Sequence, residues 1–123
     1  MGNLYEQTGS YEPDNLIIGT TINSALKGVT LASGQGVLSR GTVIGIVTAS
    51  GLGKVCDKAS ADGSEVASFI LADEVDTTDA SVVAQCYQSG EFNRGALVFG
   101  GTDTPADHED ELRTVNIILK DAV

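Results

Sequence analysis

The chain has one histidine and two cysteines, which are side chains that could bind a metal such as zinc. His108 lies in the acidic run of residues 107–111, whereas Cys56 and Cys86 lie in apolar segments far from it in the sequence. Zinc sites usually take ligands in pairs at short spacing, and the chain has no such pairs. We therefore expect His108 on the solvated face of a surface helix, and the cysteines as small core side chains in a reducing compartment. Whether Cys56 and Cys86 are close enough to pair is left open.

Lys58 is the one candidate for a covalent modification. It lies in the triplet Asp57-Lys58-Ala59, and lipoyl-type carrier domains, which are also small and rich in strands, carry their modified lysine in such a triplet at an exposed hairpin turn. The acidic and hydroxyl residues that usually precede the triplet are replaced here by Val55 and Cys56. The match covers three residues, so a carrier domain is kept as an alternative.

The signatures of common enzyme sites are missing. Gly34, Gly36 and Gly41 do not have the spacing of a dinucleotide-binding loop, and they precede a strand instead of opening a helix. There is no G-x-S-x-G nucleophile elbow. The acidic residues of 73–79 do not follow the EF-hand pattern. We therefore expect no enzyme activity, with no catalytic residue, no cofactor and no metal site.

Composition limits the partners that the chain can have. It has 123 residues and a net charge of −10, with a pI of about 4.2. Nucleic-acid binding needs Lys and Arg to replace phosphate counterions, so neither nucleic acid nor an anionic membrane surface is an expected partner. No apolar run is long enough for a transmembrane helix, and the N-terminus does not resemble a signal peptide.

The same composition suggests self-association. The chain has no Trp, three Phe and three Tyr, against 15 Gly. Large aromatic side chains bury the most apolar area per residue, so a core without many of them gains less free energy. We expect part of the apolar surface to be buried against another subunit.

Strand signals dominate the secondary structure. Apolar, β-branched segments recur between Gly, Asp and Ser turns, which is typical of a compact β domain. We predict a turn at Ser89-Gly90, after which Glu91-Phe92 pairs back on the preceding strand. The predicted strands cover residues 16–22, 29–31, 42–49, 54–57, 66–71, 80–87 and 115–119.

One short helix is predicted, beginning after Thr104. Thr104 suits the N-cap, Pro105 the first helical position, and Asp107 the third, where its carboxylate can complete a capping box. The helix is expected to end near Leu112-Arg113. The fold class is therefore mainly β (α+β with one short helix), as a compact β-sandwich or partly open barrel. It comprises a body of residues 16–123 and a flexible N-terminal arm of residues 1–15.

The chain resembles bacteriophage head decoration proteins of the lambda protein D-like family. The resemblance runs from about Leu16 to Asp121, and its specificity comes from the order and spacing of several short segments. These are residues 38–45, 62–67, Ile70-Leu71 with Val75-Asp76, 96–99 and 111–113.

The resemblance implies a non-enzymatic accessory capsid protein. Such proteins bind as homotrimers to the outer surface of the expanded head, at threefold and quasi-threefold sites, and stabilise the shell against the internal DNA pressure. The expected partner is the major capsid protein of the same phage, and the expected location is the virion exterior, with the host cytoplasm during assembly.

The resemblance also implies that the N-terminal arm orders on the capsid. An extended segment can add a strand to an exposed sheet edge of a partner. The expected capsid-binding residues are Leu4, Tyr5, Tyr11, Leu16 and Ile17. Another virion subunit, such as a tail tube or tail terminator protein, remains an alternative that would form rings or tubes instead of binding the head.

Overall fold

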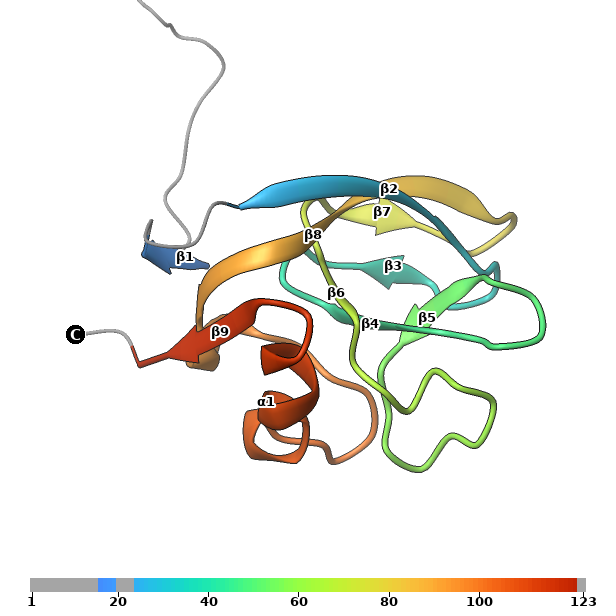
Figure 1. Ribbon diagram of the computed structural model, residues 1–123. Helices are drawn as coiled ribbons and strands as arrows, with labels where there is room; N and C mark the ends of the chain where they lie inside the picture. The colour runs from blue at the N-terminus through green and yellow to red at the C-terminus, as the bar shows by residue number, and fades with distance from the viewer. Residues whose placement is uncertain (1–15, 20–23, 122–123) are drawn as a thin grey trace, which may run out of the picture.

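The computed structural model describes residues 16–19 and 24–121, and strands dominate this part of the chain. The predicted mainly β fold with one short helix is confirmed (Figure 1). The elements are β1 (Ile17–Gly19), β2 (Ala25–Leu31), β3 (Val37–Leu38), β4 (Val43–Ile46), β5 (Gly53–Val55), β6 (Phe69–Leu71), β7 (Val75–Asp76), β8 (Val82–Asn93), the 3-10 helix η1 (Arg94–Ala96), α1 (Pro105–Arg113) and β9 (Ile117–Lys120).

Five of the strands close into a barrel. Their order is β8-β2-β5-β4-β6, and β6 pairs back onto β8. The neighbours are antiparallel, except that β2 meets β5 in parallel at Leu31 and Gly53. Because every barrel strand has a neighbour on each side, the barrel has no free edge over its paired stretches. The short pair β3–β7 lies outside this ring.

Strand β8 belongs to two sheets. Its first part pairs with β2 and β6, while its last part pairs antiparallel with β1 and parallel with β9. The predicted turn at Ser89-Gly90 is wrong, because the strand runs on to Asn93. Gly90 has a φ of 140° and lies against the Phe92 ring. The glycine therefore lets the strand bend from one sheet into the other without a hairpin.

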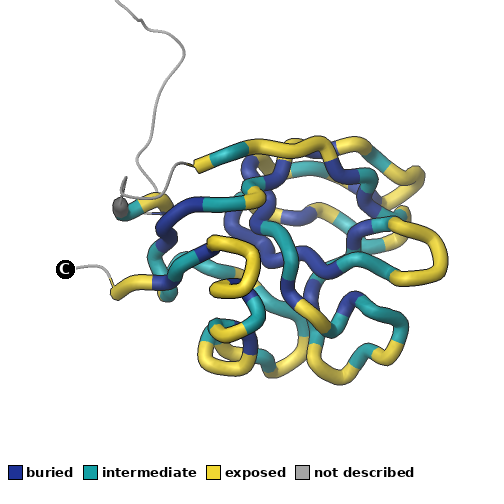
Figure 2. Tube along the Cα trace, in the orientation of Figure 1, coloured by how far each residue is buried: buried dark blue, intermediate teal, exposed yellow. Residues whose placement is uncertain are grey.

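The core has two parts that share strands. Figure 2 marks the buried residues along the trace in dark blue. Along β4, Val43 belongs to the part that packs against α1, and Ile44 to the part inside the barrel. Along β6, Ile70 and Leu71 divide in the same way. This alternation follows from the two-residue period of a strand, which sends neighbouring side chains to opposite faces.

The cysteines are divided between these two parts of the core. Cys56 lies in the part against α1, Cys86 lies inside the barrel, and both thiols are buried and free. Their prediction as core side chains is confirmed. Burial raises the pKa of the Cys86 thiol to about 11, which keeps it protonated and unreactive.

Helix α1 is the element that the sequence predicted most closely. The Thr104 N–H donates to the Asp107 carboxylate at 2.8 Å, as expected for one half of a capping box. Pro105 is the first helical residue and Arg113 the last. Asn116, with a φ of 66°, then turns the chain into β9. Leu112 faces the core and is fully buried.

Several predicted strands have different lengths in the structure. The strand predicted over residues 66–71 is confined to β6, and the strand predicted over 29–31 extends back to Ala25 as β2. Within the described residues, no helix is long and apolar enough to cross a membrane.

Candidate functional site

The predicted capsid-binding residues fall into two groups. Leu4, Tyr5 and Tyr11 lie outside the described residues. Leu16 is 2% exposed and packs in the core, while the neighbouring Ile17 is 36% exposed. Of the two described residues, Leu16 therefore ties the start of the body to the core, and Ile17 is available to a partner.

Strand β1 attaches the N-terminal end of the body to the second half of β8. Ile17 is opposite Phe92, and Gly19 is opposite Glu91. The backbone carbonyl of Leu16 accepts a hydrogen bond from the Asn93 N–H at 2.7 Å. Figure 1 shows β1 and β9 at the same end of the molecule, both beside β8. The chain therefore enters and leaves the described body at one end.

The described surface carries several large apolar side chains that are more than a third exposed. Val83 of β8 is 68% exposed and Leu26 of β2 is 52% exposed. The antiparallel register places Val83 opposite Thr30, and Val83 also borders Gly28. The outer face of the β2–β8 pair thus exposes apolar surface. The full set is Ile17, Leu26, Val37, Val66, Val83, Val98 and Val115.

His108 is buried, and the expectation of a solvated position is wrong. Its side chain is 1% exposed, and its ring stacks on Phe99 with centroids 5.2 Å apart. Nε2 lies 2.5 Å from an Asp103 carboxylate oxygen, and Nδ1 lies 2.7 Å from Glu111 Oε1. The histidine therefore lies between two carboxylates.

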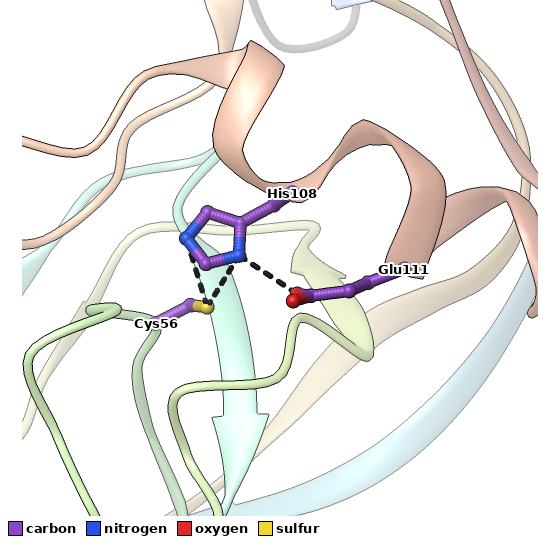
Figure 3. A group of neighbouring side chains, drawn as sticks. All are labelled: Cys56, His108 and Glu111. Atoms are coloured by element: carbon purple, nitrogen blue, oxygen red, sulfur yellow. Dashed lines mark hydrogen bonds and ion pairs between the residues drawn. The ribbon is translucent and has the colours of Figure 1, made fainter.

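The fold also brings a thiol to this histidine. Cys56 Sγ, which follows β5, lies 3.7 Å from Nδ1 and 3.8 Å from Nε2 of His108. Figure 3 shows the sulfur and the Glu111 carboxylate converging on the imidazole ring. The acidic residues 107–111 predicted a solvated helix face, but His108 within this run is buried. Nothing in the spacing of residues 56 and 108 indicates that they meet.

The charges around this cluster are mostly negative. Burial raises the pKa of the Cys56 thiol to about 12, and the charges of Glu111 and Asp103 add to this effect. For His108, burial alone lowers the pKa, but hydrogen bonds to Asp103 and Glu111 outweigh it and raise the pKa above its ordinary value. The Asp103 side chain is 1% exposed, and its Oδ1 has no hydrogen-bond partner. The cluster therefore favours a positive charge at its centre.

Lys58 does not stand free at a hairpin tip. It lies in the loop after β5, and its ammonium group is 3.3 Å from the Asp107 carboxylate of α1. Its backbone N–H donates to Asp103 Oδ2 at 2.7 Å. The lysine thus helps to attach this loop to the start of the helix, which differs from the hairpin position that a carrier lysine occupies.

Comparison with known proteins identifies a family over most of the chain. A family model described as bacteriophage lambda head decoration protein D matches residues 5–117. The matched range includes β1 to β8, helix α1 and the start of β9, together with part of the N-terminal segment. A search among curated proteins gave no match.

Proposed function

The chain belongs to the bacteriophage lambda head decoration protein D family, and from this premise we propose that it binds as a homotrimer to the outside of the expanded phage head and stabilises the shell against the pressure of packaged DNA. Membership makes the chain a structural capsid accessory protein of the virion. The family match over residues 5–117 is the observation that carries this function.

The proposed partner is the major capsid protein of the same phage, and the proposed contact is the N-terminal arm. The described body begins at Leu16, whose buried side chain fixes the end of the arm to the core. The exposed Ile17 follows directly. An extended segment that leaves from this point could add a strand to the shell, where main-chain hydrogen bonds give affinity and anchor side chains give specificity.

The surface charge supports an exterior position. A chain with a net charge of −10 is repelled by packaged DNA and has no surplus of Lys and Arg to replace phosphate counterions. Assembly of the proposed complex takes place in the host cytoplasm, where buried free thiols such as Cys56 and Cys86 are stable.

Trimer formation is supported by the exposed apolar side chains. Val83 and Leu26 on β2–β8 would lose contact with water if a second copy covered this face. We expect light scattering behind size exclusion to give a mass of about three chains of 12.7 kDa. A monomeric mass in solution combined with isolated single copies on the shell would contradict the trimer.

Binding is expected to depend on the state of the shell. Each trimer would present three arms, so weak contacts add up once the three sites have the right spacing. Mixed with purified shells of the same phage, the protein should co-sediment with expanded heads and not with procapsids, because capsomer rearrangement creates the sites.

The outcomes of this experiment separate the candidate functions. Equal binding to both shell states would contradict the dependence on expansion. No binding to either, together with sixfold rings in solution, would favour a tail tube or terminator subunit. A lipoyl group on Lys58 in protein from a lipoylating host, detected by intact mass, would favour the carrier alternative.

A further inference from the structure

We propose that Cys56, His108 and Glu111 form a zinc site that ties helix α1 to the segment that follows β5. One ligand atom of each residue lies within 4.8 Å of the other two. Cys56 and His108 are buried, and Glu111 reaches the surface with a side chain that is 34% exposed. The site is independent of the arm and of the exposed apolar face.

The three donor atoms are those that zinc takes in proteins. Zinc binds thiolate sulfur at about 2.3 Å, imidazole nitrogen at about 2.0 Å and carboxylate oxygen at about 2.0–2.2 Å. Tetrahedral angles at these lengths place the ligand atoms about 3.3–3.7 Å apart. The distance from Cys56 Sγ to His108 Nδ1 is 3.7 Å, which fits directly. The distance from Nδ1 to Glu111 Oε1 is 2.7 Å, so the partly exposed Glu111 side chain has to retract slightly.

Asp103 holds the histidine in the orientation that this site needs. Its Oδ2 accepts from His108 Nε2, which leaves Nδ1 to Glu111 and within 3.7 Å of Cys56 Sγ (Figure 3). Metal-binding histidines typically donate their second N–H to a carboxylate in this way, which fixes the tautomer. Glu111 is also positioned, because its Oε1 accepts from the Ala67 N–H at 2.8 Å.

The carboxylates around the cluster carry more negative charge than one protonated histidine can balance, which favours binding of a further cation. Two carboxylates, those of Asp103 and Glu111, contact the His108 ring. Asp103 also retains a buried oxygen, Oδ1, without a partner. A buried carboxylate oxygen that lacks a donor is costly, and a nearby divalent cation lowers that cost through its charge.

Zinc binding exchanges two protons for the metal. Bonds form from zinc to Cys56 Sγ, His108 Nδ1 and Glu111 Oε1, while the thiol proton and the Nδ1 proton leave to solvent. No electron is transferred. The summed charge of Cys56, His108, Asp103, Glu111 and the bound ion is −1 before and after, because zinc brings two charges and two protons leave. The fourth coordination position is left for water at the exposed side of Glu111.

Cobalt titration of the full-length chain, kept reduced with a phosphine, tests the site directly. We expect one Co²⁺ per chain, with thiolate-to-cobalt charge-transfer absorption and the visible bands of tetrahedral cobalt, all displaced by Zn²⁺. Cys56→Ala should abolish the charge-transfer band. Cys86→Ala is the matched control, because Cys86 is equally buried but lies inside the barrel. It should leave the spectrum unchanged.

Asp103→Asn separates a positioning role from a general loss of structure. It should weaken zinc affinity by about 10–100-fold while keeping the cobalt spectrum, as substitutions beside metal-bound histidines do. X-ray absorption of the zinc-loaded wild type does not depend on any variant, and it should show one sulfur at about 2.3 Å with nitrogen and oxygen at about 2.0 Å. A shell of nitrogen and oxygen alone, or a charge-transfer band that survives in Cys56→Ala, would overturn the site.

Discussion

Deleting residues 2–14 is expected to abolish binding to expanded heads while leaving the trimer intact. The deletion removes Leu4, Tyr5 and Tyr11 but keeps Leu16, which packs in the core. The proposed trimer would lose three arms together, so the apparent affinity should fall by more than about 100-fold. Co-sedimentation with expanded heads measures the loss, and light scattering shows whether the mass stays near three chains.

Two control variants distinguish the contribution of the anchor side chains from that of the length and charge of the arm. A variant in which residues 2–14 are scrambled has the same length, composition and charge, and it should bind more weakly than the wild type because its anchor side chains are misplaced. Replacing Leu4, Tyr5 and Tyr11 together by Ala keeps the backbone that would add a strand, so it should weaken binding without removing it. Undiminished occupancy of heads by the deletion variant would show that the body, and not the arm, makes the contact.

Gly45→Ala is expected to be the most damaging of the small substitutions in the barrel. A Cβ at Gly45 would lie 2.2 Å from the backbone oxygen of Ser64 and 2.7 Å from that of Val66. Both neighbours are backbone atoms, so relief requires movement of the β5–β6 loop or of β4 itself. We expect a cost of about 3 kcal/mol or more, at or above the upper end for overpacking, from a total stability of about 5–15 kcal/mol. Urea unfolding followed by circular dichroism measures it.

Gly28→Ala is the matched control for that substitution. Gly28 also lies in a barrel strand, but a Cβ there meets only the Val83 and Gln85 side chains, at 3.6 Å and 3.9 Å. The variant should be as stable as the wild type or slightly more stable, because alanine restricts the unfolded chain. Equal stability of the Gly45→Ala and Gly28→Ala proteins would show that the β5–β6 loop can move away from the added Cβ without loss of stability.

Local sequence signals predicted the parts of the fold that depend on local chemistry. Helix α1 begins where Thr104, Pro105 and Asp107 predicted, because capping and a proline at the first position act within one turn. The turn predicted at Ser89-Gly90 was wrong for the opposite reason. Glycine permits both a hairpin and a bend, and pairing of β8 with β1 and β9 decides between them.

The histidine cluster was beyond sequence reasoning because its parts come from separate segments. Cys56 follows β5, Asp103 precedes α1, and His108 lies on the helix face that turns inward. A buried helix face is normally recognised by apolar residues that recur every three or four positions. In this acidic helix of nine residues, the buried position 108 is polar, so that pattern is not visible. The apolar Leu112, four residues after His108, was the one signal that this face is buried.

Strand β8 also determines when during synthesis the protein can fold. It pairs with β1, β2, β6 and β9, and three of these partners precede it in the sequence. Ile17 pairs with Phe92, so β1 stays without this partner until the 75 residues that follow it have been synthesised. Such long-range pairing slows folding, because loop closure has to precede the contacts that stabilise it. The pairing around β8 is therefore complete only after β9, at Ile117–Lys120, has been synthesised.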